Sequence, residues 1–143
     1  MCDWTLHTMR ISDTVIRQLT QAARESDVRS QHAAAILDKS GKIMAMASNY
    51  HFHKPINKSN WLPEGDYTMH AEEAVYQKFM RQYPHLIKLA KLKKNIAYIL
   101  VVIRIQRGGE HCIHSKPCKK CTQKINKLIK LNIINRVYYS VNP

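Results

Sequence analysis

No run of apolar residues in this sequence is long enough to cross a membrane. A membrane-spanning helix needs about 20 consecutive apolar residues, and the longest apolar run, Ile96 to Ile103, has the length of a strand. The N-terminus also lacks the basic start and the long apolar segment of a secretory signal. We therefore expect an intracellular, cytoplasmic protein that has no membrane partner.

The chain has little glycine, and no repeat, linker or low-complexity stretch divides it. Its 143 residues include 4 glycines and 5 prolines. Hydrophobic residues make up 45% of the sequence, which is typical of a globular protein with a buried core. We therefore expect a single folded domain over residues 1–143.

Acidic residues are also scarce. There are 10 Asp and Glu residues against 23 Lys and Arg residues, which gives a formal net charge of +13. Such a charge attracts anions, among them nucleotides and single-stranded nucleic acid. The sequence is rich in Ile and Asn as well as Lys, so the lysine excess can equally reflect its general composition. Charge alone therefore leaves nucleic-acid binding open.

The spacing of the apolar residues predicts alternating helices and strands. A helical stripe runs from Ile11 to about Ser26, and Ser12 or Asp13 can cap its start. The other expected elements are a β-hairpin over 32–37 and 42–48, a polar irregular loop from 49 to 68, a helix from 69 that ends or kinks at Pro84, a second helical piece over 85–92, a buried strand over 97–105, a helix that begins at Pro117, and a strand over 137–141.

Strands connected through helices indicate an α/β layered fold with a mixed or largely parallel sheet. On the helix that begins at Pro117, helical spacing places Cys121, Ile125, Leu128 and Ile129 on the face toward the sheet.

Only four cysteines occur, and two of them, Cys118 and Cys121, stand three positions apart. In a chain that is not secreted, such a pair is typical of a metal or redox site. His70-Ala71-Glu72 opens another predicted helix. Catalytic zinc sites use three imidazole, thiolate or carboxylate ligands and leave the fourth position for water. His70, Cys118 and Cys121 supply such a set, and the start of a helix favours the thiolate form of cysteine.

Glu72 lies two residues beyond His70 and need not be a ligand. Its carboxylate can take a proton from a water molecule at the metal and return it to a leaving amine. Each motif alone has an ordinary alternative: the cysteines could form half of a structural zinc site or a redox pair, and His-Ala-Glu could be a plain helix start. Their order, each at a helix start, favours a catalytic zinc site.

Together the two motifs read His-x-Glu…Pro-Cys-x-x-Cys, the signature of zinc-dependent deaminases. From the first helix to Val141 the chain resembles the cytidine deaminase-like superfamily, and the segments Ser115–Cys121 and Ile134–Ser140 are similar to its small nucleotide-type members. The resemblance implies a three-layer α/β/α fold around a central mixed sheet. It also implies a zinc-dependent hydrolase that acts on cyclic amidine C–N bonds and forms a homo-oligomer.

The resemblance also implies substrate contacts. Asn49 would contact the sugar, the backbone of Ala71 would contact the base, and Ser115 and Lys116 would border the exocyclic amine. Two features depart from the family: the fifth strand and the final helix are missing after Val141, and the spacer from Glu72 to Pro117 is long. We expect the extra length to cover the site or to form an oligomer interface.

Two substrate classes follow from this resemblance. The compact length and basic charge favour a free cytosine nucleoside or nucleotide of the deoxycytidylate or cytidine type. The alternative is cytosine or adenine within single-stranded DNA or RNA, such as a tRNA loop, where the base must be flipped into the pocket. A third hypothesis is a binding module whose zinc is only structural. The presence of Glu72 argues against it, because a site without catalysis needs no carboxylate that transfers protons.

Further residues near the motifs allow two interpretations each. A second, structural zinc could be bound, or the same side chains could be exposed loop residues: His51, His53, His111, Cys112 and His114. Aromatic residues of the long loop could stack on a base or pin the loop to the core: Tyr50, Phe52, Trp61 and Tyr67. The lysines at 120, 124 and 127 fit the solvated face of a helix, whereas Lys116 adjoins the metal site.

Overall fold

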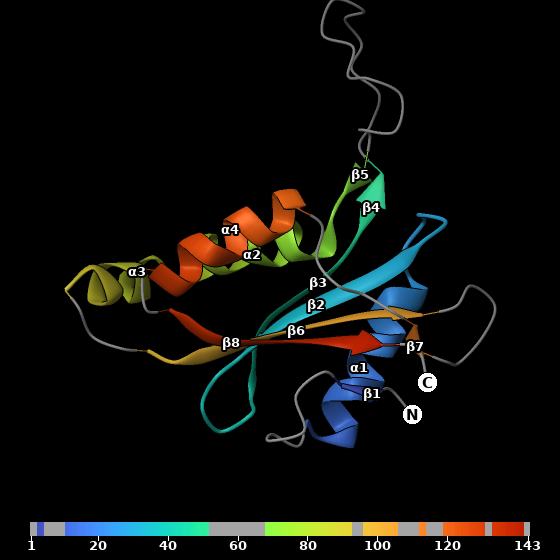
Figure 1. The fold of residues 1–143 in the computed structure, drawn as a ribbon, viewed down its shortest axis with the longest axis horizontal. Coiled ribbons are helices and arrows are strands. Elements are labelled where there is room, and N and C mark those ends of the chain that lie inside the picture. Colours follow the sequence, from blue (N-terminus) through green and yellow to red (C-terminus); the bar gives the residue numbers. More distant parts are fainter. Residues whose placement is uncertain are drawn as a thin grey trace, which may run out of the picture.

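The computed structural model describes residues 3–4, 11–51, 68–92, 96–105, 112–113, 119–130 and 133–141. A central sheet has the strand order β1 (Asp3–Trp4), β8 (Ile134–Val141), β6 (Tyr98–Ile105), β2 (Gln31–Leu37) and β3 (Ile43–Ser48), and β7 (Cys112–Ile113) pairs with β6. Figure 1 shows α1 (Asp13–Arg24) on one side of this sheet and α2 (Ala71–Gln82), α3 (Pro84–Lys91) and α4 (Lys119–Lys130) on the other. No helix of these ranges is long and apolar enough to span a membrane.

The structure confirms the expected three-layer α/β/α fold with a mixed sheet. Strands β6 and β8, which α4 connects, are parallel, and every other pair in the sheet is antiparallel. The strand β1 was not expected from the sequence. It pairs with the outer edge of β8, with Asp3 opposite Val141 and Trp4 opposite Ser140.

Side chains of the two central strands alternate between the two helical layers. In β2, Ala34 and Ile36 join a core cluster with α2 and α4, whereas Ala33 and Ala35 join a second cluster with α1. Strand β6 divides its residues in the same way. Because both strands are buried on both faces, they read as nearly continuous apolar runs, as central strands do.

The helix ends follow local chemistry. The hydroxyl of Ser12 accepts a hydrogen bond from the Val15 N–H at 3.2 Å, so Ser12 rather than Asp13 caps α1. Helix α2 ends at Gln82, and Pro84 is the first residue of α3. Proline suits that position because the first N–H groups of a helix have no acceptor within it.

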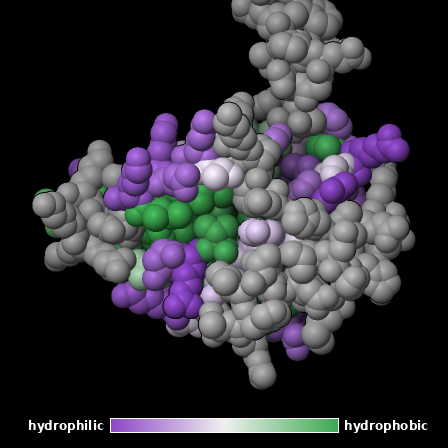
Figure 2. All heavy atoms as spheres, viewed as in Figure 1, coloured by the Kyte–Doolittle hydropathy of each residue, from purple (hydrophilic) through white to green (hydrophobic). Residues whose placement is uncertain are grey.

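One expectation for α4 was wrong. Ile125 is buried, with 6% of its surface exposed, but Ile129 is 40% exposed. A helical residue four positions on is rotated by about 40° around the axis. Since the main contacts of α4 among the described elements are with α2 and β8, this rotation carries Ile129 out of the narrow contact. Figure 2 shows apolar side chains at the surface between α4 and β8. The side chains of Cys121 and Leu128 lie outside the described residues.

The segment 49–68, which was expected to be an irregular loop, is paired near its two ends. Tyr50–His51 (β4) and Thr68–Met69 (β5) form a two-stranded antiparallel ribbon that leads into α2. Tyr50 is 43% exposed. Phe52, Trp61 and Tyr67 lie outside the described residues, so their two interpretations stay open.

The turn between β2 and β3 generates a first prediction. Asp38 accepts hydrogen bonds from the Ser40 hydroxyl (2.6 Å) and the Ser40 and Lys42 N–H groups (both 2.9 Å), and those from Ser40 hold the pKa of Asp38 below its ordinary value. Gly41 has φ of +89° with no atom within 4 Å of an added Cβ. Gly41→Ala should therefore lower the free energy of unfolding by about 1 kcal/mol through backbone strain alone.

Urea unfolding measures this change, and Gly41→Asn is the matched control. Asparagine tolerates positive φ better than alanine does, so it should cost less. Equal stability of Gly41→Ala and the wild type would contradict the assignment of strain to this turn.

Candidate active site

The described site residues lie toward one end of the sheet. The parallel strands β6 and β8 end on this side, and Figure 1 shows α2 and α4 beginning on the same side. In α/β folds the carboxyl ends of parallel strands are the usual place for a site. His70 directly precedes α2, and Cys121 lies in the first turn of α4.

His70 occupies the capping position of α2 without serving as its cap. Its backbone is extended (φ −70°, ψ 148°), its side chain makes no capping hydrogen bond, and the residue is exposed. The imidazole therefore belongs to an exposed residue at the start of α2. That placement suits a ligand and is unlike that of a core histidine.

Glu72 is the second residue of α2 and only 8% exposed. Its neighbours Ala71 and Ala74 are buried, so the first turn of α2 packs against the core. Glutamate is rarely buried without a partner, and the N-terminus of a helix stabilises a carboxylate. The fold therefore holds a carboxylate beside His70, largely shielded from water.

The remaining predicted zinc ligands lie partly outside the described residues. The backbone of Cys121 is placed in α4, but its side chain is not described, nor is any part of Cys118, Ser115 or Lys116. Within the part of the chain that the structure describes, no three His, Cys, Asp or Glu side chains gather as a metal site. One imidazole and two thiolates are a donor set that zinc favours, so the chemistry of His70, Cys118 and Cys121 fits this metal.

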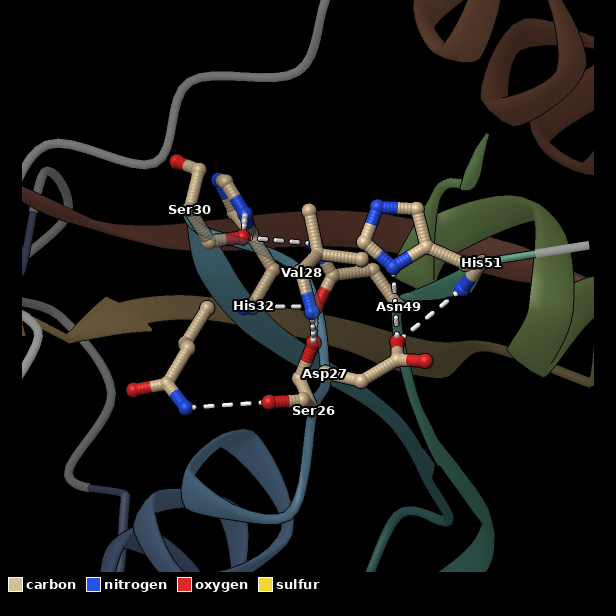
Figure 3. Close-up of polar contacts among 8 residues, drawn as sticks. Ser26, Asp27, Val28, Ser30, His32, Asn49 and His51 are labelled. Atoms are coloured by element: carbon tan, nitrogen blue, oxygen red, sulfur yellow. Dashed lines mark hydrogen bonds and ion pairs between the residues drawn. The ribbon is translucent and has the colours of Figure 1, made fainter. Parts of the chain in front are cut away.

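Of the residues predicted for a second zinc, only His51 has a described side chain. Its Nδ1 lies 3.2 Å from the Asp27 carboxylate, which also accepts the His51 backbone N–H at 3.0 Å (Figure 3). His53, His111 and His114 lie outside the described residues, and Cys112 is placed only by its backbone in β7. The second zinc site stays a prediction.

Asn49 is buried at the end of β3, with 6% of its surface exposed. Its Oδ1 accepts hydrogen bonds from the Ser26 hydroxyl (2.6 Å) and the His32 N–H (3.0 Å), and its Nδ2 donates to the Ser30 carbonyl (2.6 Å), as Figure 3 shows. The partners fix the orientation of the amide, because a backbone N–H only donates and a carbonyl only accepts. A sugar hydroxyl at Asn49 would have to accept the second Nδ2 hydrogen.

His32 stands next to this network at the start of β2. Its Nδ1 is 3.1 Å from the Ser30 carbonyl, so Nδ1 carries the hydrogen and Nε2 is the acceptor in the neutral ring. Burial lowers the pKa of His32, and the positive charges of Arg104 and His70 lower it further, against the opposing effect of the Ser30 hydrogen bond. The ring is therefore neutral at pH 7.

Sequence reasoning did not identify Ser26, Ser30 or His32. Ser26 and Ser30 lie between α1 and β2, where small polar residues are ordinary, and no local pattern marks them. His32 did carry a signal, because it is a polar residue at the start of an otherwise apolar strand.

Comparison with known proteins identifies the family. The family described as "Cytidine and deoxycytidylate deaminase zinc-binding region" matches residues 9–141. The chain therefore belongs to the cytidine and deoxycytidylate deaminase family, which is characterised at family level by zinc binding.

Among solved structures, the chain is similar to the dCMP deaminase from the cyanophage S-TIM5 in its apo form. The two are 16% identical, with a TM-score of 0.38, over 88% of this chain and 98% of the other. No curated protein matches the sequence.

The Asn49 network generates a second prediction. Asn49→Ala removes the acceptor of the Ser26 hydroxyl and of the His32 N–H at a buried position, and it removes one of the two donors to the Ser30 carbonyl. Groups left unpaired in this way are costly, so we expect the free energy of unfolding to fall by about 2 to 3 kcal/mol. Denaturant unfolding provides the measurement. Asn126→Ala, at an exposed position of α4, is the control and should change stability by less than about 0.5 kcal/mol.

Proposed function

We propose that this protein is a zinc-dependent hydrolytic deaminase that converts cytosine to uracil in a free nucleoside or nucleotide of the deoxycytidylate type. The observation that carries the proposal is the buried carboxylate of Glu72 beside the exposed His70 at the start of α2. Family membership supports deamination as the reaction class. The basic charge of +13 supports a substrate that carries phosphate.

His70, Cys118 and Cys121 would hold the zinc ion. Zinc in such a site acts as a Lewis acid and makes water nucleophilic near neutral pH. The oxygen of the water forms a bond to C4 of cytosine. The Glu72 carboxylate takes the two water protons in turn and delivers one to the ring N3 and one to the amino nitrogen, so that the C4–N bond breaks and ammonia leaves. The backbone of Ala71 is suited to hold the base, because the first N–H groups of a helix have no acceptor within it.

The substrate contacts follow from the positions around this helix start. Asn49 would offer the second hydrogen of its amide to a sugar hydroxyl, because its other polar atoms are engaged. Ser115 and Lys116, directly before Pro117, would border the exocyclic amine. The protein would act as a homo-oligomer in the cytoplasm.

A second candidate function is deamination within single-stranded DNA or RNA. It is favoured by the net charge of +13 and by the exposed Tyr50 at the start of the long stretch before His70. An exposed aromatic ring near the site could stack on a neighbouring base. Strong binding of single strands that weakens steeply with salt would support this alternative.

The role of Glu72 generates a third prediction. Glu72→Gln keeps the size of the side chain but removes the proton acceptor, so we expect kcat to fall by about 10²- to 10⁴-fold while zinc stays bound. Ammonia release from cytidine, deoxycytidine, CMP, dCMP, single-stranded DNA and tRNA measures the activity, and elemental analysis measures the zinc.

Glu73→Gln is the matched control, because Glu73 lies in the same turn of α2 and is partly exposed. It should retain turnover. A Glu72→Gln protein that deaminates at the wild-type rate would refute the proposed proton transfer, and a zinc protein without turnover on any of these substrates would favour a structural zinc.

The predicted ligands generate a fourth prediction. Purified protein should contain about one zinc ion per chain, and Cys118→Ser or Cys121→Ser should remove most of it because a hydroxyl is a poor zinc ligand. Cys2→Ser is the control and should leave the zinc content unchanged. Full zinc content in Cys118→Ser or Cys121→Ser would contradict the ligand set, and two zinc ions per chain would support the second site.

A further inference from the structure

Arg104 places a charge within the otherwise apolar strand β6. Two residues before it, Val102 belongs to the core cluster beneath α2 and α4. Side chains on one face of a strand recur at every second residue, so Arg104 lies on the side of the sheet that α2 and α4 cover. It is also near the carboxyl end of β6, which is the edge where α2 and α4 begin.

The Nε atom of the Arg104 guanidinium lacks a partner within the described residues. It is buried and has no hydrogen-bond acceptor there. No described carboxylate forms an ion pair with this side chain. A buried donor without an acceptor is unfavourable, and such a group in a native fold requires an explanation. A ligand that accepts hydrogen bonds and carries negative charge would provide one.

The surroundings of Arg104 are those of the candidate active site. Arg104 is directly opposite His32 in the pairing of β6 with β2. The His32 N–H in turn donates to the side-chain Oδ1 of Asn49, and the His32 carbonyl accepts the Asn49 N–H. Arg104 lies close enough to His32 to lower its pKa, after the larger effect of burial. Arg104 and His32 therefore lie together at the end of the sheet where Asn49 and the start of α2 lie.

We propose that Arg104 binds the phosphate group of a mononucleotide substrate. This inference rests on the proposed function and specifies its substrate. A guanidinium can bind phosphate through two parallel hydrogen bonds. Arg104 lies about two strand spacings, or about 10 Å, from Asn49, and a nucleotide whose sugar lies at Asn49 has its phosphate within reach of a long arginine side chain.

The partial burial of Arg104 favours a mononucleotide over a continuous strand. A strand that crosses the protein surface meets exposed lysines, such as those on α4. Arg104 instead lies under the helical layer with its Nε shielded from solvent. A single phosphate that enters the pocket together with its base can reach this position.

The test compares kcat/KM for dCMP and deoxycytidine in the wild type, Arg104→Gln and Arg104→Lys. We expect Arg104→Gln to lower kcat/KM for dCMP by about 10- to 100-fold, mainly through KM. Activity on deoxycytidine should stay within about twofold, since that substrate has no phosphate. Arg104→Lys should recover part of the dCMP activity because it keeps the charge. Arg17→Gln, exposed on α1 across the sheet, is the control and should change neither value.

An equal loss on both substrates, or no loss on either, would overturn the assignment. Arg104→Lys keeps the test decisive if Arg104→Gln does not fold: unchanged dCMP preference together with a reduced melting temperature would indicate a purely structural residue.

A binding experiment separates this inference from the proposed function. Calorimetry measures the affinity of zinc-loaded protein for dUMP, deoxyuridine and inorganic phosphate, with and without Arg104→Gln. Loss of dUMP and phosphate binding in Arg104→Gln would support the phosphate site even if no cytosine compound were deaminated. If the protein deaminates cytosine compounds but binds dUMP equally well with and without Arg104→Gln, the phosphate site is overturned and the proposed function still holds. Arg104-dependent binding of an oligonucleotide without terminal phosphate would overturn the mononucleotide assignment.

Discussion

The antiparallel pairing of β2 with β6 is the constraint on which the site depends. Both strands are buried on both faces, and their register sets Ala34 opposite Val102 and His32 opposite Arg104. A shift of β2 by one residue would turn all of its side chains to the other layer and would bury His32 beneath α1. Because β2 begins and β6 ends on the side of the sheet where α2 starts, the same register places His32 and Arg104 on the side of the candidate site.

The fold was largely predictable from the sequence because its main elements have strong apolar periodicity. The hairpin, β6, α1 and α2 were expected close to their observed bounds, and β8 begins at Ile134, three residues before its expected start. The strands β1, β4, β5 and β7 were not expected, since two-residue strands leave no periodicity and depend on distant partners. The exposure of Ile129 depends on how α4 packs at the side of its layer, which helical spacing alone does not specify.

The site was predictable only where a motif marked it. His70 and Glu72 came from the motifs and their metal chemistry, and Asn49 came from the family resemblance, but the burial of Glu72 and the contacts of Asn49 depend on tertiary structure. The hydrogen bond between Ser26 and Asn49 connects residues 23 positions apart in the sequence, and no sequence pattern predicts such a pair. Arg104 could have been noticed, because a charge inside a buried strand conflicts with its surroundings. Cys118, Ser115 and Lys116 stay predictions.

The amide of Asn49 also connects the two helical layers. The segment that it holds, from Ser26 to Ser30, directly follows α1, whose side chains pack on the far face of the sheet. The position of α1 is thereby linked through a few short hydrogen bonds to Asn49 at the end of β3. Substitutions beneath α1 would therefore shift Asn49 as well, so changes on one face of the sheet can adjust a side chain that the opposite layer does not hold in place.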